Sequence, residues 1–581
     1  MPNTIQDKDR KDHYDVIVVG AGGGGMTAAL TAHEQGLSVL VIEKDAVYGG
    51  TTAVSGGGVW IPCNEQMAGL GIPDTEEEAM TYLRRLTRGE VPEARLRAYA
   101  HRAREMIAYV RDHFDVHFEA VRQYPDYFPD QPGGKRGART MEPAVFDARQ
   151  LGPLFDQQRP SYKGLMVMGR VAMTQVEGHT LLTRGRRWLW LTIKLMLRYW
   201  TDFAWRRHSA RDRRQTMGQA LVASLRHALA QQDIPLRLRC GMESLLEEDG
   251  RVVGVAVSGE RGREALYAAR GVILACGGFE SNQKMREEFL PAPTQASWTA
   301  APGCNVGDGI RAGRKLGARL GFMDLTWGAP TLSTPAGGPA AALCMERQLP
   351  GCVAVNKAGH RFCNEALPYT EFVYAMIAEQ AKSGGGVPCW LVFDAAFRKN
   401  YPMGPLMPSS IKPDSRLPAN WLGSVYWRAD TLQELAARIG VDAAGLAESV
   451  AHMNQFAATG VDAEFNKGGN AFDRYYGDPH VSPNPCLAPI VKAPFYAIRM
   501  DAGELGTKGG LVADENARVL REDGSVIEGL YAIGNTSAAL MGRTYAGPGA
   551  TIGPALTFGY IAAMDVATRG VRRPEVVAVS A

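Results

Sequence analysis

Short apolar runs that end in glycine or other small residues punctuate the chain near its start and near its end. Residues 16–19 form an apolar run typical of a buried parallel strand, a helical stretch follows, and a second strand spans 38–42. Two more apolar strands close on small residues, one in GVILACGGFESN and one at 530–533. This pattern predicts an α/β fold.

The turn after the first strand carries glycines in GxGxxG spacing, at Gly20, Gly22 and Gly25. The first glycine permits a tight turn, the second lets the backbone approach a pyrophosphate, and the third lets the helix pack close to the strand. Glu43 ends the second strand, where a carboxylate can accept hydrogen bonds from ribose hydroxyls. The combination predicts a Rossmann-like dinucleotide site with the helix N-terminus facing phosphate.

Two further glycine-rich pieces indicate a long, flat ligand held at both ends. Small residues and hydroxyls dominate the segment 49–58, within YGGTTAVSGGGVW. Far along the chain, YAIGN ends a strand at Gly534 and Asn535, and a second glycine-rich turn enters a helix near Pro554. These features favour FAD over NAD.

Composition and charge exclude several classes of protein. The chain has 581 residues, enough for two or three domains, and a net charge of +3, which gives no reason to expect a nucleic-acid partner. Nine cysteines occur without a CxxC pair, so we expect reduced thiols and neither a disulfide framework nor a metal site. No signal peptide and no spanning segment are visible, which predicts a cytoplasmic protein.

GAGGGG, GGTTAVSGG, ACGGFESN and YAIGN resemble the FAD-binding domain that fumarate reductases share with 3-ketosteroid dehydrogenases. The resemblance spans most of the chain except roughly 160–214, and it implies FAD bound without a covalent link. It also implies that a helix beginning near Ala555 and Leu556 directs its N-terminus at the flavin O2. The residues that match the family's cofactor motifs are Gly20, Gly22, Gly25, Glu43, Thr51, Thr52, Ser55, Gly57 and Asn535.

The resemblance also implies a split FAD-binding domain. We expect it to comprise residues 1–299 and 487–581, with an α+β catalytic domain at 300–486 inserted between the two parts. Helical patterns near 371–382 and 431–458 lie inside this insertion. The active site is then expected between the domains, against the flavin ring.

Three tyrosine-bearing segments indicate which member of this group the chain resembles. Fumarate reductases carry a His shortly before a Gly-Gly pair, but here Thr507 and Lys508 precede the glycines in AGELGTKGGLV. RQYPDYFPDQPGG, FCNEALPYTEF and RTYAGPGATIG instead resemble the 3-ketosteroid Δ1-dehydrogenases. Carried over by motif, the catalytic residues are Tyr127, Tyr369, Tyr545 and Gly549, with Tyr124 as a pocket wall.

The resemblance implies a 1,2-desaturation, and the chemistry explains why these groups suit it. Tyr545 and the Gly549 amide polarise the C3 ketone, which makes the hydrogens on carbon 2 acidic. Tyr369 removes that proton as a base, helped by a hydrogen bond from Tyr127 because phenol has a pKa near 10. Hydride passes from carbon 1 to flavin N5. An external electron acceptor, such as a quinone, completes turnover.

Three other functions remain open on the sequence. The first is a 3-ketosteroid Δ4-(5α)-dehydrogenase, which shares fold, cofactor and substrate class. The second is a fumarate-reductase-like enzyme, which the missing His disfavours. The third is a flavin-binding protein that mediates interactions at a membrane without turnover.

Residues 184–214 form a basic stretch with nine arginines, one lysine and two aspartates, a local charge of +8. Placed on one helix, 188–205 gathers apolar side chains on a broad arc, opposite a polar side with Arg187, Lys194 and Arg198. We expect this segment to dock the enzyme peripherally on the inner face of a membrane, where bulky sterol-derived ketones reside. The alternative is packing on its own FAD domain or on a second subunit. The arc comprises Trp188, Leu189, Thr192, Ile193, Met196, Leu197, Tyr199, Trp200, Phe203 and Ala204.

Overall fold

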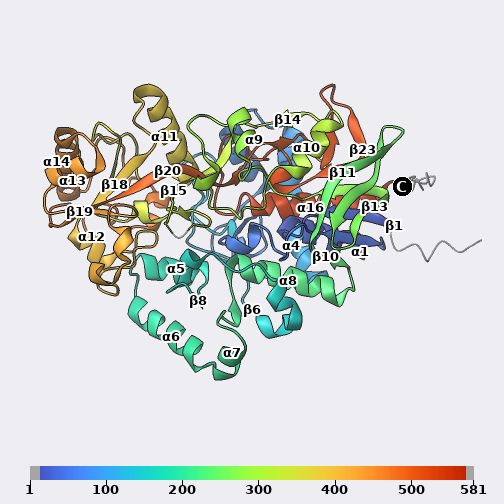
Figure 1. Cartoon of the computed structure of the whole chain (residues 1–581), viewed down its shortest axis with the longest axis horizontal. Coiled ribbons are helices and arrows are strands. Elements are labelled where there is room, and N and C mark those ends of the chain that lie inside the picture. Colours follow the sequence, from blue (N-terminus) through green and yellow to red (C-terminus); the bar gives the residue numbers. More distant parts are fainter. Residues whose placement is uncertain (1–12, 336, 571–581) are drawn as a thin grey trace, which may run out of the picture.

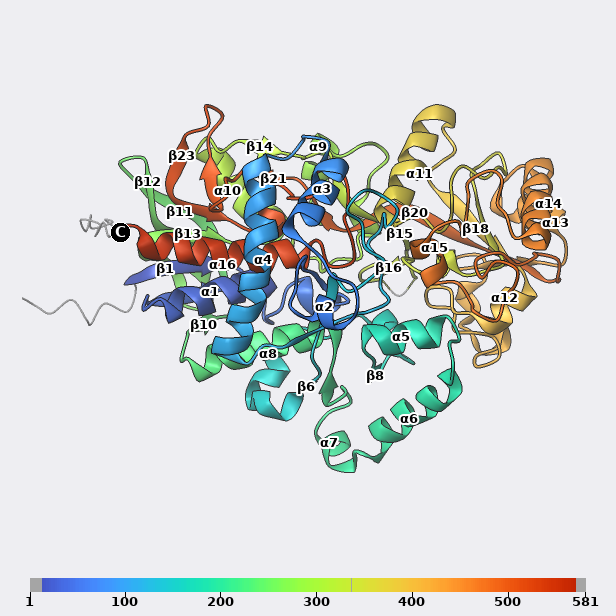
Figure 2. The ribbon, with the colours of Figure 1, turned by 180° about the vertical axis from the view of Figure 1, so that it is seen from behind.

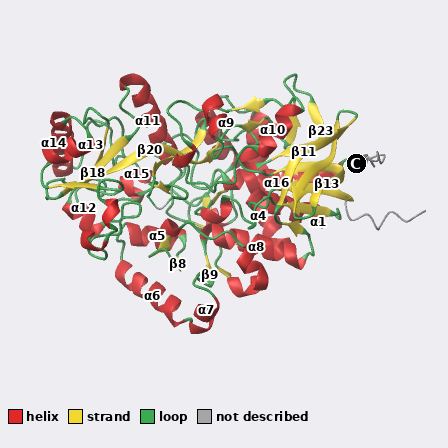
Figure 3. Cartoon of the chain, in the orientation of Figure 1, coloured by secondary structure: helices red, strands yellow, loops and turns green. Residues whose placement is uncertain are grey.

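The computed structural model describes residues 13–335 and 337–570. Two regions of β-sheet lie toward opposite ends of the molecule, with helices and long loops between them (Figures 1 and 3). The first region contains both the start and the end of the described chain, and the strands of the second come from residues between 326 and 507. The expected α/β architecture is confirmed.

The first region is an eight-stranded sheet. Its centre is parallel: the first strand lies between the second strand and β13, and β13 also pairs in parallel with the late strand β23. An antiparallel extension runs from β13 through β12 to β11. The strands are β1 (His13–Val19), β2 (Val39–Ile42), β10 (Leu236–Arg237), β11 (Cys240–Glu248), β12 (Arg251–Gly259), β13 (Gly262–Leu274), β22 (Arg518–Leu520) and β23 (Val526–Ala532).

Helices from distant parts of the sequence pack together against this sheet. The helix after β1, α1 (Gly23–Glu34), lies beside α16 (Ile552–Thr568), and α4 (Glu93–Phe114) crosses α16 on its other side, as Figure 2 shows. All three contribute to one apolar core. Nearby lie α2 (Gln66–Gly69), α3 (Glu76–Thr87), α8 (Met217–Gln231), α9 (Gln283–Phe289), α10 (Asp308–Lys315), β3 (Val59–Trp60), β4 (Phe118–Ala120) and β5 (Thr140–Pro143).

The second region is a six-stranded sheet with its own apolar cores. Its longest strand, β20 (Phe495–Thr507), pairs with β15, β18 and β19. This sheet therefore extends past residue 487, where we expected the chain to return to the first domain. The other strands are β15 (Thr326–Leu332), β16 (Ala341–Ala342), β17 (Cys352–Val355), β18 (Cys389–Phe393) and β19 (Trp427–Ala429).

The helical patterns expected in this region are present with one difference. Residues 431–458 form two helices and not one, because Gly440 adopts a left-handed conformation at the end of the first. The helix expected near 371–382 is α11 and begins at Tyr369 itself. The helices are α11 (Tyr369–Ser383), α12 (Ala395–Asn400), α13 (Leu432–Ile439), α14 (Ala443–Thr459) and α15 (Ala471–Tyr475).

Residues 175–208, which include most of the basic stretch, form a helical arm that extends from the body in both views (Figures 1 and 2). Our prediction of one helix over 188–205 was wrong. The first helix ends before Asp202, whose carboxylate accepts a hydrogen bond from Trp205 N at 3.4 Å and caps a second helix. Within the described part of the chain, no helix has the length and apolarity to cross a bilayer. The arm comprises α5 (Gln175–Leu182), α6 (Trp188–Thr201) and α7 (Phe203–His208).

Candidate active site

The turn between β1 and α1 has the geometry of a phosphate-binding loop. Gly20 has φ 113°, and a Cβ there would lie 2.3 Å from the Ala275 carbonyl oxygen. A Cβ on Gly25 would lie 2.1 Å from the Gly20 carbonyl oxygen, so only glycine lets the helix pack so close. In contrast, a Cβ on Gly22 would meet nothing closer than 3.9 Å. Protein atoms therefore fill the space beside Gly20 and Gly25, whereas the space beside Gly22 is free for a ligand.

Glu43 lies beside this turn at the end of β2. Its carboxylate accepts hydrogen bonds from the Ala21 and Asp45 amides, both at 3.0 Å. Burial raises the pKa of this carboxyl group, while the two amides oppose the rise. Each oxygen keeps further lone pairs for a ligand hydroxyl. The carboxylate and the open Gly22 face together fit the ribose and pyrophosphate of FAD.

The start of α16 meets the start of α1. A Cβ on Gly24 would lie 2.8 Å from the Ala555 carbonyl oxygen, and a Cβ on Gly23 would lie 3.3 Å from Leu556 Cδ2. The Gly23 amide donates a hydrogen bond to the Thr52 hydroxyl at 3.2 Å. Two helix N-termini and the segment after β2 therefore converge, and their dipoles favour negative charge at this point.

The other residues expected at the cofactor hold the walls of this region. Thr51 accepts a hydrogen bond from the Asn305 amide group at 2.9 Å. Ser55 bridges its own turn, accepting from the Gly57 amide at 3.0 Å. Asn535 accepts from the Trp327 indole at 3.0 Å, a link to the second sheet. The contacts of Thr51 and Asn535 join segments that lie far apart in the sequence.

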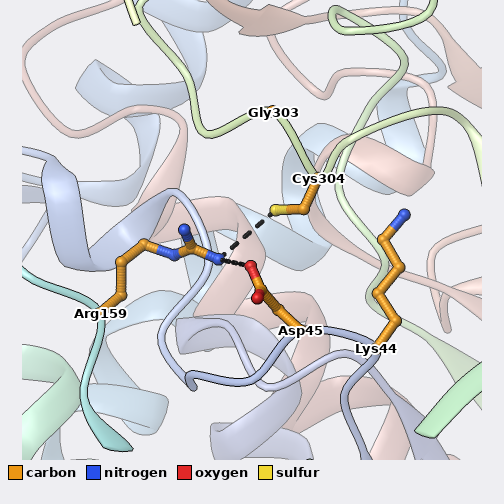
Figure 4. Close-up of a pocket in the computed structure, with 5 residues that line it drawn as sticks. All are labelled: Lys44, Asp45, Arg159, Gly303 and Cys304. Carbon is orange, nitrogen blue, oxygen red and sulfur yellow. Dashed lines mark hydrogen bonds and ion pairs between the residues drawn. The ribbon is translucent and has the colours of Figure 1, made fainter. Parts of the chain in front are cut away.

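A small surface pocket adjoins this region and is shown in Figure 4. Arg159 spans it, forming an ion pair with Asp45 and contacting the Cys304 sulfur at 3.6 Å. Lys44 pairs instead with Asp308 at 2.5 Å. Asp45 and Lys44 directly follow Glu43, so the pocket marks the outer edge of the nucleotide site. Its charges are largely paired within the protein.

The structure brings the three predicted catalytic tyrosines together from three distant segments. The rings of Tyr127, Tyr369 and Tyr545 pack edge to face, with centroids 5.1–5.8 Å apart. All three side chains are buried. The three residues lie on the loop before β5, at the first position of α11 and on the loop before α16. Apart from the family resemblance, nothing in the sequence indicates that these three segments meet.

Backbone and ionic contacts fix this tyrosine cluster. The Tyr127 amide donates to the Ala546 carbonyl oxygen at 3.1 Å, which joins two of the three segments directly. The segment that leads into Tyr369 is held by a buried ion pair in which Arg361 binds Glu365 through two hydrogen bonds of 3.0 Å. Gly549, at φ 91°, lies so close to the Gly58 backbone that a Cβ would approach it to 2.5 Å.

The three hydroxyls differ in their surroundings. Burial raises the pKa of all three phenols, and for Tyr127 and Tyr369 the rise is well above the ordinary value. For Tyr545, the rise in pKa is opposed by the Thr551 hydroxyl, the Tyr369 hydroxyl and the Gly549 amide, which all stabilise the phenolate. Among the described residues, the buried Tyr127 hydroxyl has no partner within hydrogen-bond distance, although it lies near enough to the Tyr369 hydroxyl to lower the pKa of that phenol. Such a group is expected to meet a ligand, because buried polar atoms rarely remain unpaired.

Tyr124 lies at the edge of the cluster and belongs to a second aromatic group. Its hydroxyl accepts a hydrogen bond from Tyr476 at 2.8 Å, and its ring stacks on Tyr475 with centroids 4.7 Å apart. His179, from α5, stacks on the other face of Tyr475 at 4.0 Å. A stack of three rings therefore runs from α5 to Tyr124, which shares an apolar core with the three tyrosines. Sequence reasoning missed these partners, which carry no motif.

Lys508, which with Thr507 precedes the Gly-Gly pair in place of the expected histidine, is fully buried. Its ammonium group donates to the carbonyl oxygens of Arg543 and Thr544 at 2.8 and 2.6 Å and lies over the Trp327 ring. Burial lowers its pKa to about 7. Since these carbonyls directly precede Tyr545, the lysine supports that segment and does not face a dicarboxylate.

Comparisons with known proteins agree with this geometry. A family model described as an FAD binding domain matches residues 15–552. The chain is 44% identical over 565 residues to the 3-oxosteroid 1-dehydrogenase of Mycolicibacterium smegmatis, covering 95% of this chain and 97% of the relative. It is 52% identical, with a TM-score of 0.94, to the 3-ketosteroid Δ1-dehydrogenase of Sterolibacterium denitrificans in complex with 1,4-androstadiene-3,17-dione, covering 96% and 99% of the two chains.

A third comparison concerns the alternative desaturase. The 3-ketosteroid Δ4-(5α)-dehydrogenase of Rhodococcus jostii RHA1 matches with a TM-score of 0.65 and 20% identity, covering 98% of this chain and 99% of that one. At this identity the match shows a shared fold and nothing about the reaction.

The parallel sheet, the glycine turn and the matched family model define a flavoprotein that binds FAD. Among flavoproteins, the similarity at 44% identity over 95% of the chain is to a 3-oxosteroid 1-dehydrogenase. The chain belongs to the family of FAD-dependent 3-oxosteroid 1-dehydrogenases.

Proposed function

We propose that the tyrosine cluster desaturates the C1–C2 bond of 3-ketosteroids. The observation that carries this proposal is the meeting of Tyr127, Tyr369 and Tyr545 beside the start of α16. FAD, when bound, supplies the hydride acceptor. The substrate loses a proton from carbon 2 and a hydride from carbon 1, which leaves a new double bond between these carbons. A membrane quinone is the proposed external electron acceptor.

Tyr545 and Gly549 act on the ketone. The Gly549 amide lies close enough to the Tyr545 hydroxyl oxygen to lower the pKa of that phenol, so the two donors lie side by side. A ketone oxygen that enters there accepts a hydrogen bond from each of them. These fixed donors stabilise the negative charge that develops on the oxygen as the carbon 2 proton leaves.

Tyr369 acts as the base, with Tyr127 as its partner. The hydroxyl of Tyr127 lowers the pKa of Tyr369 and opposes the larger rise caused by burial. Tyr127 also has a free acceptor site, because no described residue donates a hydrogen bond to its hydroxyl. The pair can therefore receive the substrate proton and pass it along without exposing the site to water.

A saturated substrate distinguishes the proposed reaction from its closest alternative. A 5α-3-ketosteroid without ring double bonds offers both the C1–C2 and the C4–C5 bonds. The proposal predicts the 1-ene as the first product. The 4-ene as first product would identify a Δ4-(5α)-dehydrogenase.

The rate should rise with pH. Tyr369 works only as phenolate, and its pKa is raised, so at neutral pH most molecules hold the inactive, protonated form. The active fraction grows as pH increases toward that pKa. Stopped-flow measurement of flavin reduction by steroid should show a rate that increases between about pH 7 and 10, because the ordinary phenol pKa is near 10 and burial raises that of Tyr369 further. Tyr127→Phe should move this rise to higher pH. A rate that is flat or falls over this range contradicts Tyr369 as the base.

We further propose that the helical arm docks the enzyme on an anionic bilayer. The face of α6 and α7 that points away from the body is apolar, and its side chains are 48% to 69% exposed. This exposed face consists of Leu189, Trp190, Ile193, Leu197, Trp200 and Phe203. Tryptophan and leucine on a helix that lies beside arginine and lysine suit the headgroup region of a membrane.

The contacts of the arm correct two parts of the sequence interpretation. Tyr199, predicted on the lipid-facing arc, is buried, and its hydroxyl donates to the Ala210 carbonyl oxygen at 2.7 Å. Several arginines are already paired within the arm and the loop that follows it: Arg198 pairs with Asp212 at 3.2 Å and Arg214 with Glu177 at 2.7 Å. Lipid attraction therefore falls to the exposed cations, which are Arg186, Arg187, Lys194 and Arg207.

A bilayer position suits the substrate. Sterol-derived ketones with long side chains reside in membranes, and the stack of rings from His179 through Tyr475 to Tyr124 leads from the arm to the apolar core that holds the catalytic tyrosines. We therefore propose bulky, long-side-chain 3-ketosteroids as preferred substrates. The enzyme is placed peripherally at the inner face of the membrane.

Replacing Trp190 and Trp200 by Glu should abolish binding to anionic vesicles. The two rings are 63% and 51% exposed, so the change removes interfacial anchors without disturbing the core. Co-sedimentation with phosphatidylglycerol vesicles measures the bound fraction. Leu422→Glu is the matched control, because Leu422 is 54% exposed on the second domain. Equal sedimentation of the double variant and the control would refute docking, and a concentration-dependent dimer lost in the double variant would assign the face to a second subunit.

A further inference from the structure

A threonine directly precedes helix α16, but its side chain does not cap the helix. Thr551 occupies the N-cap position, where a hydroxyl usually accepts a hydrogen bond from the second or third amide of the helix. Here the second amide, Gly553 N, donates to the Gly549 carbonyl oxygen at 2.8 Å. The third position is Pro554, which has no amide hydrogen. The Thr551 side chain makes no capping bond.

The hydroxyl thus left free is used elsewhere. Thr551 Oγ1 donates to the Tyr545 hydroxyl oxygen at 2.9 Å, across six positions of the chain. The bond stabilises negative charge on the Tyr545 oxygen and lowers its pKa against the rise caused by burial. A phenol that accepts one hydrogen bond directs its own proton elsewhere and becomes a stronger donor.

We infer that Thr551 is a positioning residue that orients the Tyr545 hydroxyl toward the steroid ketone and strengthens it as a donor. This inference rests on the proposed role of Tyr545 at the ketone. Thr551 acts through Tyr545 and does not itself contact the reacting carbons. The sequence Thr-Ile-Gly-Pro at 551–554 provides for this role, because proline removes the competing amide from the start of the helix.

Thr551→Val keeps the shape of the side chain and removes the donor. We expect kcat/KM to fall about 10- to 100-fold, the range for a hydrogen bond that stabilises developing charge. The C3 carbonyl stretch of bound 1,4-dien-3-one product, measured by isotope-edited infrared spectroscopy, should shift toward its value in solution. Thr551→Ser should restore both quantities. Flavin content should match that of the wild type.

Thr557→Val is the matched control. Thr557 is one turn and a half further along the same helix, is fully buried, and its hydroxyl donates to the Gly553 carbonyl oxygen at 2.8 Å. The Thr557→Val variant loses one buried hydroxyl from the same helix, and that hydroxyl does not contact Tyr545. This variant should therefore leave the carbonyl stretch unchanged, and any loss of kcat/KM should remain small.

A double-mutant cycle with Tyr545→Phe separates this inference from the proposed function. If Thr551 acts through Tyr545, the Val substitution has little further effect once the phenol is gone. An equal fall in kcat/KM in both backgrounds overturns the inference. So does a Thr551→Val enzyme whose kcat/KM is within twofold of wild type, or one whose fall in kcat/KM is explained by a lower flavin content. If Tyr545→Phe itself retains wild-type kinetics, the role of Tyr545 fails instead.

Discussion

Replacing Tyr369 by Phe should lower the turnover number by about 10²- to 10⁴-fold, the usual contribution of a general base. The ring still packs against Tyr127 and Tyr545, since their contacts are edge to face between rings. Steroid binding should therefore survive, because the ketone is held by other groups. Single-turnover flavin reduction measures the rate, and the change in the flavin spectrum on adding steroid measures binding.

Tyr496→Phe is a suitable control for the loss of a buried phenol. Its hydroxyl donates to Asp414 at 2.8 Å in the second sheet, away from the tyrosine cluster. It should reduce stability more than turnover. Near-normal flavin reduction by the Tyr369→Phe enzyme would remove Tyr369 from the mechanism.

Replacing Gly22 by Val should abolish FAD binding while the protein still folds. The nearest protein atom to a Cβ at this position is Thr52 Oγ1 at 3.9 Å, so the added Cβ meets no close contact. It does occupy the face of the turn that the pyrophosphate needs. The purified variant should be colourless, with an unfolding temperature that free FAD no longer raises.

Gly69→Val provides the comparison. Gly69 is exposed on α2, and a Cβ there meets nothing within 4 Å. That variant should retain its full complement of flavin. If the Gly22→Val protein also folds with full flavin, the pyrophosphate does not lie at this turn.

The first domain could be predicted because its signals are local. The strand, the glycines and Glu43 follow one another within about thirty residues, and their spacing alone defines the turn that the structure contains. The tyrosines were found only through resemblance to a family. Nothing in composition or periodicity indicates that Tyr127 and Tyr545, more than 400 residues apart, pack ring against ring.

The missed features depend on contacts that a sequence pattern does not contain. Thr551 has the sequence of an ordinary N-cap, and its role emerges only when Tyr545 lies beside it. The arm was predicted as one helix because Asp202 fits the helical period, yet its carboxylate caps the next helix and binds Arg213 at 2.6 Å. Charge counting likewise could not show that Arg198 and Arg214 are paired.

The central claim is that this enzyme places a double bond between carbons 1 and 2 of a 3-ketosteroid. The most direct test incubates the purified flavoprotein with a 3-keto-4-ene steroid and an artificial electron acceptor, and identifies the product by mass spectrometry and NMR. We expect the 1,4-dien-3-one, two mass units lighter than the substrate and formed in equal amount to a two-electron acceptor that is reduced. Unchanged steroid in the presence of bound FAD, or a new double bond at any other position, would contradict the account.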